Sequence, residues 1–132
     1  MSARPRSREE AGGLPSGALQ AFGVVGGMAA WGVALLTAYP MVQVACAVGQ
    51  PLLVHLVRWV AMLVALAATL TARHVHLRAR ATADALTDDD PVLVERAHRV
   101  RFVGFGGMLV SATGVLLLVV EDLATWVIDP CL

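Results

Sequence analysis

The sequence contains no lysine and only 15% charged residues among its 132 positions, whereas a soluble domain usually has about a quarter of its residues charged. Aromatic residues make up only 5% of the chain, and 58% of the residues are hydrophobic. Ten arginines balance ten acidic residues, so the net charge is zero, which argues against a nucleic-acid partner. The abundance of Leu, Val and Ala excludes disorder for most of the chain. The class that remains is a small integral membrane protein whose surroundings are the lipid bilayer.

A long stretch without charge contains the first predicted membrane crossing. No charged residue occurs from Ala11 to Val54, a run of 44 positions. One helix needs about 20 apolar residues to cross a bilayer. We therefore place the first helix at about residues 18–40. Pro40 and the Gly-Gln-Pro cluster at 49–51 then supply the residues of a turn.

Two further crossings follow. The second is predicted at about residues 52–72, interrupted only by His55 and Arg58 near its start, and the third at 102–120, which has no charge. The sequence thus predicts an all-α fold, an integral membrane three-helix bundle that spans residues 18–132.

The polar segments flank these crossings. Residues 1–17 are rich in Arg, Gly, Ser, Pro and Glu, and we expect a disordered tail there. The apolar stretch after it is far longer than the 7–15 residues typical of a signal-peptide core, so we expect it to be retained. Residues 73–101 are predicted to form helical extensions joined by a turn, with Asp90 as the cap and Pro91 as the first residue of the following helix.

The arginines predict an orientation. With three crossings, nine of the ten arginines lie on one side, and the positive-inside rule makes that side cytoplasmic. We therefore expect a multi-pass protein of the bacterial cytoplasmic (inner) membrane with its N-terminus inside and its C-terminus outside. The nine are Arg4, Arg6, Arg8, Arg73, Arg78, Arg80, Arg96, Arg99 and Arg101.

Each predicted crossing carries a stripe of small residues. Lipid provides no hydrophobic drive between helices, so small residues that allow close backbone approach supply much of the packing. The stripes predict packing within the monomer, and the alternative is a docking face for another membrane subunit or for self-association. They comprise Gly23, Gly27, Ala61, Ala65, Ala68, Gly104, Gly107, Ser111 and Gly114.

Four polar residues are expected to form a cluster near the outer interface. At 1.5 Å per residue, Arg58 and His55 lie about 21 Å and 25 Å from the inner end of the second crossing. Glu121 and Asp122 lie about 28–30 Å from the inner end of the third. We predict that Arg58 pairs with Glu121 or Asp122 and sets the register of the two helices. The alternative is a functional site, because charges within membrane segments are functional candidates.

The two cysteines also lie on the predicted outer side. Cys46 is expected in the loop between the first two helices, and Cys131 is the penultimate residue. An even pair in an oxidising compartment predicts a disulfide. Two alternatives stay open: free thiols, or a copper site formed by Cys46, Cys131 and His55 with Met41 as a further ligand.

No motif for catalysis is present. The sequence contains no nucleophile elbow, phosphate-binding loop, HExxH motif or paired mid-membrane carboxylates. A membrane haem would require histidines at matching depth on facing helices, and no histidine lies near the middle of a predicted crossing. We therefore predict a non-enzymatic protein with no catalytic residue, no metal and no cofactor.

Several short features together resemble a known group of proteins. They are Trp31 and Tyr39, then Cys46 and His55, then Arg101-Phe102, Ser111 and finally Asp129-Pro130-Cys131. Over about residues 20–131 the chain resembles small three-helix bacterial membrane proteins that are often encoded beside haem–copper cytochrome c oxidase genes. It departs from them in the charges of Arg58, Glu121 and Asp122. The resemblance implies an accessory or assembly component of a respiratory oxidase, with Cys46, His55 and Cys131 as the residues of interest.

Two functions thus follow from the sequence. The first is a structural or accessory membrane component. The alternative is a small transporter, channel or holin-like homo-oligomer that assembles through the glycine faces.

Overall fold

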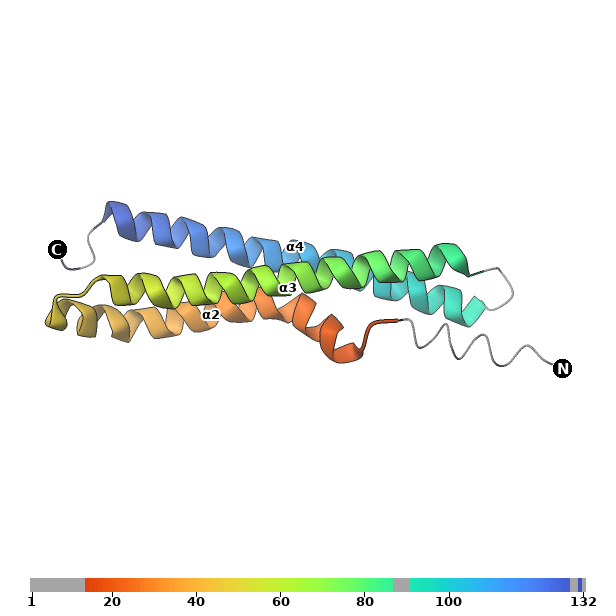
Figure 1. Ribbon diagram of the computed structural model, residues 1–132, viewed down its shortest axis with the longest axis horizontal. Helices are drawn as coiled ribbons and strands as arrows, with labels where there is room; N and C mark the ends of the chain where they lie inside the picture. Colours follow the sequence, from red (N-terminus) through yellow and green to blue (C-terminus); the bar gives the residue numbers. More distant parts are fainter. Residues whose placement is uncertain (1–13, 87–90, 129–130, 132) are drawn as a thin grey trace.

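The computed structural model describes residues 14–86, 91–128 and 131. Within these residues the chain forms three long helices: α2 (Gly17–Val48), α3 (Leu52–Ala85) and α4 (Pro91–Val127). The helices lie side by side in an elongated bundle, each antiparallel to the next (Figure 1). The predicted all-α fold is therefore confirmed for the part of the chain that is described.

The first helix does not end at Pro40, and the prediction of its end was wrong. Helix α2 continues through Pro40 to Val48. Proline is tolerated inside membrane-type helices because neighbouring groups compensate for the one hydrogen bond that it removes. The helix ends instead at Gly49, whose φ of 70° is left-handed and whose N–H bonds the carbonyl of Cys46 at 3.3 Å. This end is the glycine cap that commonly terminates helices.

The other two helices are also longer than the predicted crossings. Helix α3 continues to Ala85, and α4 begins at Pro91 and passes beyond residue 120 to Val127. Glu121 and Asp122 are therefore helical. The predicted cap at Asp90 and residues 1–13 of the predicted tail lie outside the described residues.

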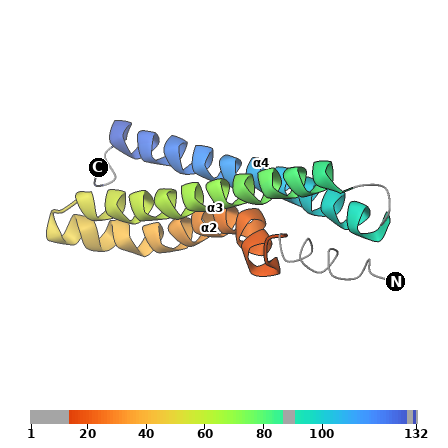
Figure 2. The same cartoon turned by 45° about the vertical axis from the view of Figure 1, so that its right-hand side comes forward.

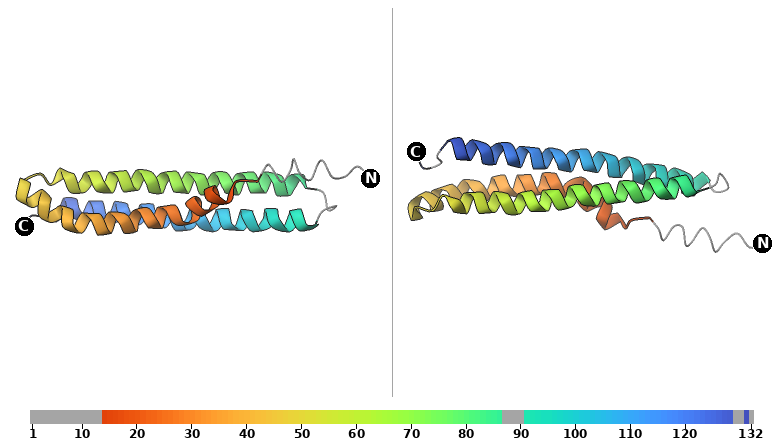
Figure 3. Two further views of the ribbon diagram at one scale, coloured as in Figure 1. Left: turned by 90° about the horizontal axis from the view of Figure 1, so that it is seen from below. Right: turned by 45° about the horizontal axis from the view of Figure 1, so that its top comes forward.

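The start of α2 is described and has an N-cap. The Ser16 hydroxyl accepts a hydrogen bond from the backbone N–H of Leu19 at 3.5 Å. The first turns of α2 diverge from the axis of the bundle, and α3 and α4 extend past them (Figures 2 and 3). One end of the molecule is thus built mainly from α3 and α4.

Small residues bring α2 and α4 into backbone contact near the middle of the bundle. A methyl group at Gly27 would overlap the backbone of Ser111, and one at Gly114 would come within 2.6 Å of the Gly27 carbonyl oxygen. The Ser111 hydroxyl donates a 2.7 Å hydrogen bond to the carbonyl oxygen of Gly23. The close approach therefore requires glycine at positions 27 and 114.

The predicted small-residue stripes face the inside of the monomer. All of their members are buried except Ala61, which is partly buried against the core cluster that contains Ala34, Ala65 and Leu118. The buried members are Gly23, Gly27, Ala65, Ala68, Gly104, Gly107, Ser111 and Gly114. These residues therefore pack the three helices of one chain against each other.

The outer faces of the helices are apolar. Each of the three described helices is long and apolar enough to cross a membrane. Only 22–28% of the residues in the most apolar stretch of each helix are buried within the chain. Large hydrophobic side chains point outward along all three helices, including Leu36, Leu63, Phe102 and Val127. This distribution is compatible with a multi-pass membrane protein, in which lipid covers the outward faces.

Candidate functional site

The candidate site lies at the end of the bundle where α2 ends, α3 begins and α4 ends (Figure 1). We call this the disulfide end, and we call the opposite end, which holds the last turns of α3 and the first turns of α4, the arginine end. The disulfide end contains both cysteines and the four polar residues that the sequence placed in one cluster.

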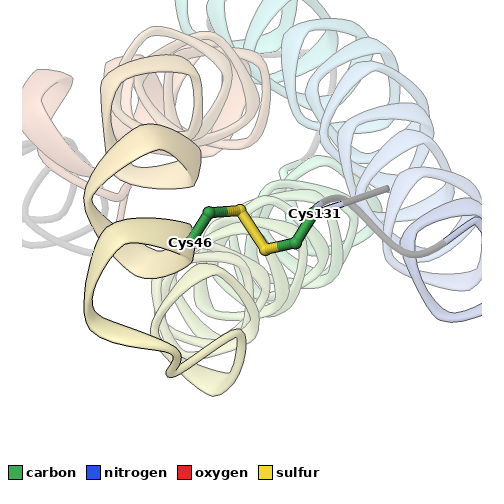
Figure 4. The surroundings of a disulfide bond; sticks show 2 residues. All are labelled: Cys46 and Cys131. Atoms are coloured by element: carbon green, nitrogen blue, oxygen red, sulfur yellow. A yellow bond between two sulfur atoms is a disulfide. The ribbon is translucent and has the colours of Figure 1, made fainter.

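Cys46 and Cys131 form a disulfide, with their Cα atoms 5.5 Å apart (Figure 4). The bond joins α2 to the chain beyond α4 across a sequence separation of 85 residues. Cys46 lies inside α2 rather than in a loop, because α2 runs past Pro40. The predicted pairing is present, and the free-thiol alternative does not hold in this structure. The copper alternative also loses its two thiolate ligands, because each sulfur is bonded to the other.

Asp122 of α4 contacts two residues of α3. One carboxylate oxygen lies 2.7 Å from Nδ1 of His55, and the other accepts a 3.3 Å hydrogen bond from Nε1 of Trp59. The ring of Trp126 lies against the His55 ring with a centroid separation of 4.7 Å. His55 is only 6% exposed, so this polar contact is nearly enclosed by α3 and α4.

Glu121, the preceding residue of α4, connects to a different helix. Its carboxylate accepts a 2.8 Å hydrogen bond from Nε1 of Trp31 on α2. Successive residues on a helix point about 100° apart. The adjacent carboxylates of Glu121 and Asp122 therefore reach α2 and α3 respectively, and together they join all three helices.

Arg58 does not pair with either carboxylate in the described residues, and this part of the prediction was wrong. Its guanidinium donates to the backbone carbonyl of Glu121 at 3.3 Å and to the hydroxyl of Thr125. The carboxylate of Glu121 bonds to the indole of Trp31 instead, and that of Asp122 bonds to the imidazole of His55. The Nε atom of Arg58 is buried without a hydrogen-bond partner among the described residues.

A cavity of about 410 Å³ lies beside Arg58, between α2 and α4. Its lining is mostly apolar and includes Leu35 and Val42 of α2 and Ile128, which follows α4. Tyr39, Arg58 and Glu121 contribute its polar edge. The cavity therefore combines an apolar wall with one positively charged side chain, Arg58, and one carboxylate, Glu121.

The structure brings His55, Arg58, Glu121 and Asp122 together, and it adds partners that the predicted polar cluster did not include. These are Trp31, Trp59, Thr125 and Trp126. The signal available in the sequence was the position of two of the three tryptophans: Trp59 lies near the start of α3 and Trp126 near the end of α4, and tryptophan is enriched at membrane interfaces.

The arrangement joins helices through polar bonds, and no catalytic constellation is evident among the residues described. The histidine–aspartate pair has an indole and a second aromatic ring as its neighbours rather than a serine or cysteine nucleophile. In residues 14–86, 91–128 and 131, no group of three or more His, Cys, Asp or Glu side chains is placed to hold a metal ion. The polar side chains instead bond to one another across α2, α3 and α4, with the Nε atom of Arg58 as an exception among the described residues.

The described part of the chain is thus a three-helix bundle compatible with a membrane protein, with one end cross-linked by a disulfide and a polar network. Comparison of the chain with protein-family models, with curated proteins and with solved structures finds no match.

Proposed function

We propose that the protein is a non-enzymatic, multi-pass component of the bacterial inner membrane with a structural or accessory role. The observation that carries this proposal is the contrast between the polar groups and the apolar surface. The polar side chains at the disulfide end bond to each other, whereas the large apolar side chains of all three helices face outward. An apolar outer surface is available both to lipid and to another membrane protein.

The closed interior favours this role over transport by the monomer. Near mid-bundle the backbones of α2 and α4 are in contact at Gly27 and Ser111. Ser111, the buried polar side chain at this level, already bonds to Gly23. A conducting path along the axis would have to pass through this contact. The transporter, channel or holin-like alternative would therefore need several copies of the chain around a shared path.

We further propose that the arginine end is cytoplasmic. Six arginines lie on α3 and α4 at this end, and Arg58 is the arginine of the disulfide end. The positive-inside rule then places the disulfide end outside, where an oxidising compartment favours a disulfide. A reporter fused to the C-terminus would be expected to be active only outside the cytoplasm, and a cytoplasmic signal would overturn this orientation.

The partner proposed is a respiratory oxidase, and the support for it is the sequence resemblance described above. The bundle presents three separate outward faces on which such a subunit could dock. Contact between one of these faces and a different membrane subunit can be tested directly.

The deciding experiment is site-specific photo-crosslinking of the full chain in its native membrane. The crosslinker replaces Leu36 on α2, Leu63 on α3 or Leu116 on α4, which are 77%, 67% and 61% exposed. We expect one of the three faces to give an adduct with a different membrane polypeptide. The other two positions serve as matched controls because they face lipid at similar exposure.

Two outcomes would contradict the accessory role. Adducts that contain only second copies of the chain would favour the homo-oligomer alternative. The absence of a protein adduct from all three faces would show that lipid covers them. Native mass spectrometry after mild solubilisation supplies an independent readout, because a homo-oligomer and a mixed complex differ in mass from the 13.9 kDa chain.

A further inference from the structure

A second cavity, of about 390 Å³, lies at the arginine end between α3 and α4. Its volume falls in the range of about 300–1,000 Å³ that is typical of ligand pockets. The lining residues are His76, His98, Arg101, Phe102 and Phe105. Among the described residues, the cavity is therefore lined by basic and aromatic side chains and by no carboxylate.

The close approach of the two helices shapes this cavity. A methyl group at Gly104 would come within 2.8 Å of the backbone nitrogen of His76. Nδ1 of His76 donates a 3.1 Å hydrogen bond to the carbonyl oxygen of Arg101, and the His76 ring lies 5.9 Å from that of Phe105. The backbone contact, the hydrogen bond and the ring contact fix the position of His76 at the edge of the cavity.

Arg101 brings a charge to the cavity that no described residue neutralises. Its side chain is half-buried and has no hydrogen bond or ion pair within residues 14–86, 91–128 and 131. Two other arginines of this end differ from it, because Arg80 pairs with Asp84 and Arg99 pairs with Glu95 on their own helices. The cavity therefore has an unpaired cation and is complementary to an anion.

The cavity also lies at the boundary between the apolar and the polar parts of the bundle. The charge-free part of α3 ends at Ala72, one turn before His76, and that of α4 begins at Phe102. Phe102 is 77% exposed on the apolar side of this boundary. In a membrane, the phosphate groups of lipids lie at this level, and basic cavities between helices bind anionic headgroups there.

We propose that this cavity binds the phosphate headgroup of an anionic phospholipid. Arg101 is the main cation, His76 and His98 line the site, and Phe102 and Phe105 contact the start of the acyl chains. The site belongs to the leaflet at the arginine end, whichever side of the membrane that is. The proposal rests on the membrane placement of the helices, but not on an accessory role.

The test is lipid binding to the purified full chain, measured by native mass spectrometry with phosphatidylglycerol and phosphatidylcholine of identical acyl chains. We expect the chain to prefer phosphatidylglycerol. One basic residue near a membrane surface strengthens anionic-lipid binding by about fivefold, so Arg101→Gln should weaken phosphatidylglycerol binding by about that factor.

Arg78→Gln is the matched control. It removes the same charge from the same end of the bundle, but Arg78 is exposed and does not line the cavity. This variant should retain the binding of the unmodified chain. Circular dichroism checks the fold of each variant. If Arg101→Gln fails to fold, His98→Gln carries the test with a smaller expected loss, because it alters an exposed side chain of the same cavity.

Three results would overturn the proposal. The first is equal binding of the two lipids. The second is an equal loss in Arg101→Gln and Arg78→Gln, which would indicate a general effect of charge. The third is glycerol phosphate binding as tightly as the lipid, which would identify a site for soluble phosphates. Because this assay uses the isolated chain, its failure is distinguishable from a failure to find a membrane partner by crosslinking.

Discussion

The two ends of the bundle use polar residues in different ways. At the disulfide end the polar bonds run between helices: Trp31 of α2 to Glu121 of α4, and His55 of α3 to Asp122 of α4. At the arginine end the described ion pairs run within one helix, as between Glu95 and Arg99, and they are exposed, whereas the bond of His76 to α4 reaches a backbone carbonyl rather than a side chain. A polar bond between helices constrains tertiary structure, whereas an exposed pair within one helix contributes little.

This difference indicates that the stability of the fold depends more on specific side chains at the disulfide end than at the arginine end. The disulfide end has few charged residues, but their hydrogen bonds, together with the covalent bond between the cysteines, hold three helices together. The arginine end has many charges that lie near water and suit orientation and lipid contact. Substitutions that conserve size should therefore affect stability strongly at the first end and weakly at the second.

The largest effect is expected from removal of the disulfide. Cys131→Ser should lower the free energy of unfolding by about 2–4 kcal/mol, because the bond closes a loop across 85 residues. Unfolding of the purified chain by a denaturing detergent measures the change. Cys46→Ser should give the same loss, and the double variant should lose no more. If thiol labelling without reductant modifies both cysteines of the unaltered chain, the disulfide is absent and the comparison of the two ends loses its strongest element.

The next effect tests the contact that lies between the two ends. Gly27→Ala should destabilise the bundle by about 1–3 kcal/mol, because its methyl group would overlap the backbone of Ser111. Gly32→Ala on the same helix is the control, since a methyl group there meets nothing within 4 Å. The same detergent unfolding compares the two variants. Equal stability would mean that α2 and α4 are not in backbone contact.

The smallest effect compares the two ends directly. Asp122→Asn should cost about 1–2 kcal/mol, because it weakens contacts with both His55 and Trp59 between helices. Glu95→Gln makes the matching change at the arginine end and should stay within about 0.5 kcal/mol, because its partner Arg99 is exposed on the same helix. Thermal unfolding of both variants in one detergent measures the difference. A loss of equal size at the two ends would remove the distinction drawn between them.

Some of these features could be predicted because they depend on local sequence or on distance along a helix. The depth of His55, Arg58, Glu121 and Asp122 follows from the rise per residue, which by itself places them at one level. The choice of partners did not follow. Arg58 contacts a carbonyl and a hydroxyl rather than a carboxylate, because rotation about each helix decides which neighbour a side chain meets.

The end of α2 shows a second limit of local sequence. Proline was expected to end the helix, but its effect depends on whether surrounding groups compensate for a lost hydrogen bond, and that is a property of packing. Gly49 ended the helix instead, and its left-handed φ placed the turn and allowed Cys46 to lie within α2.

The sequence alone determined the composition, the three apolar segments, the asymmetry of the arginines and the possibility of a single disulfide, because each depends on residue type and order. The tertiary structure alone decided that α2 and α4 meet at Gly27 and Ser111 and that Glu121 and Asp122 reach different helices. It also decided that Arg101 borders a cavity to which none of the described carboxylates contributes. These features depend on how helices rotate and cross, which is set by the fit of many side chains at once rather than by any one segment.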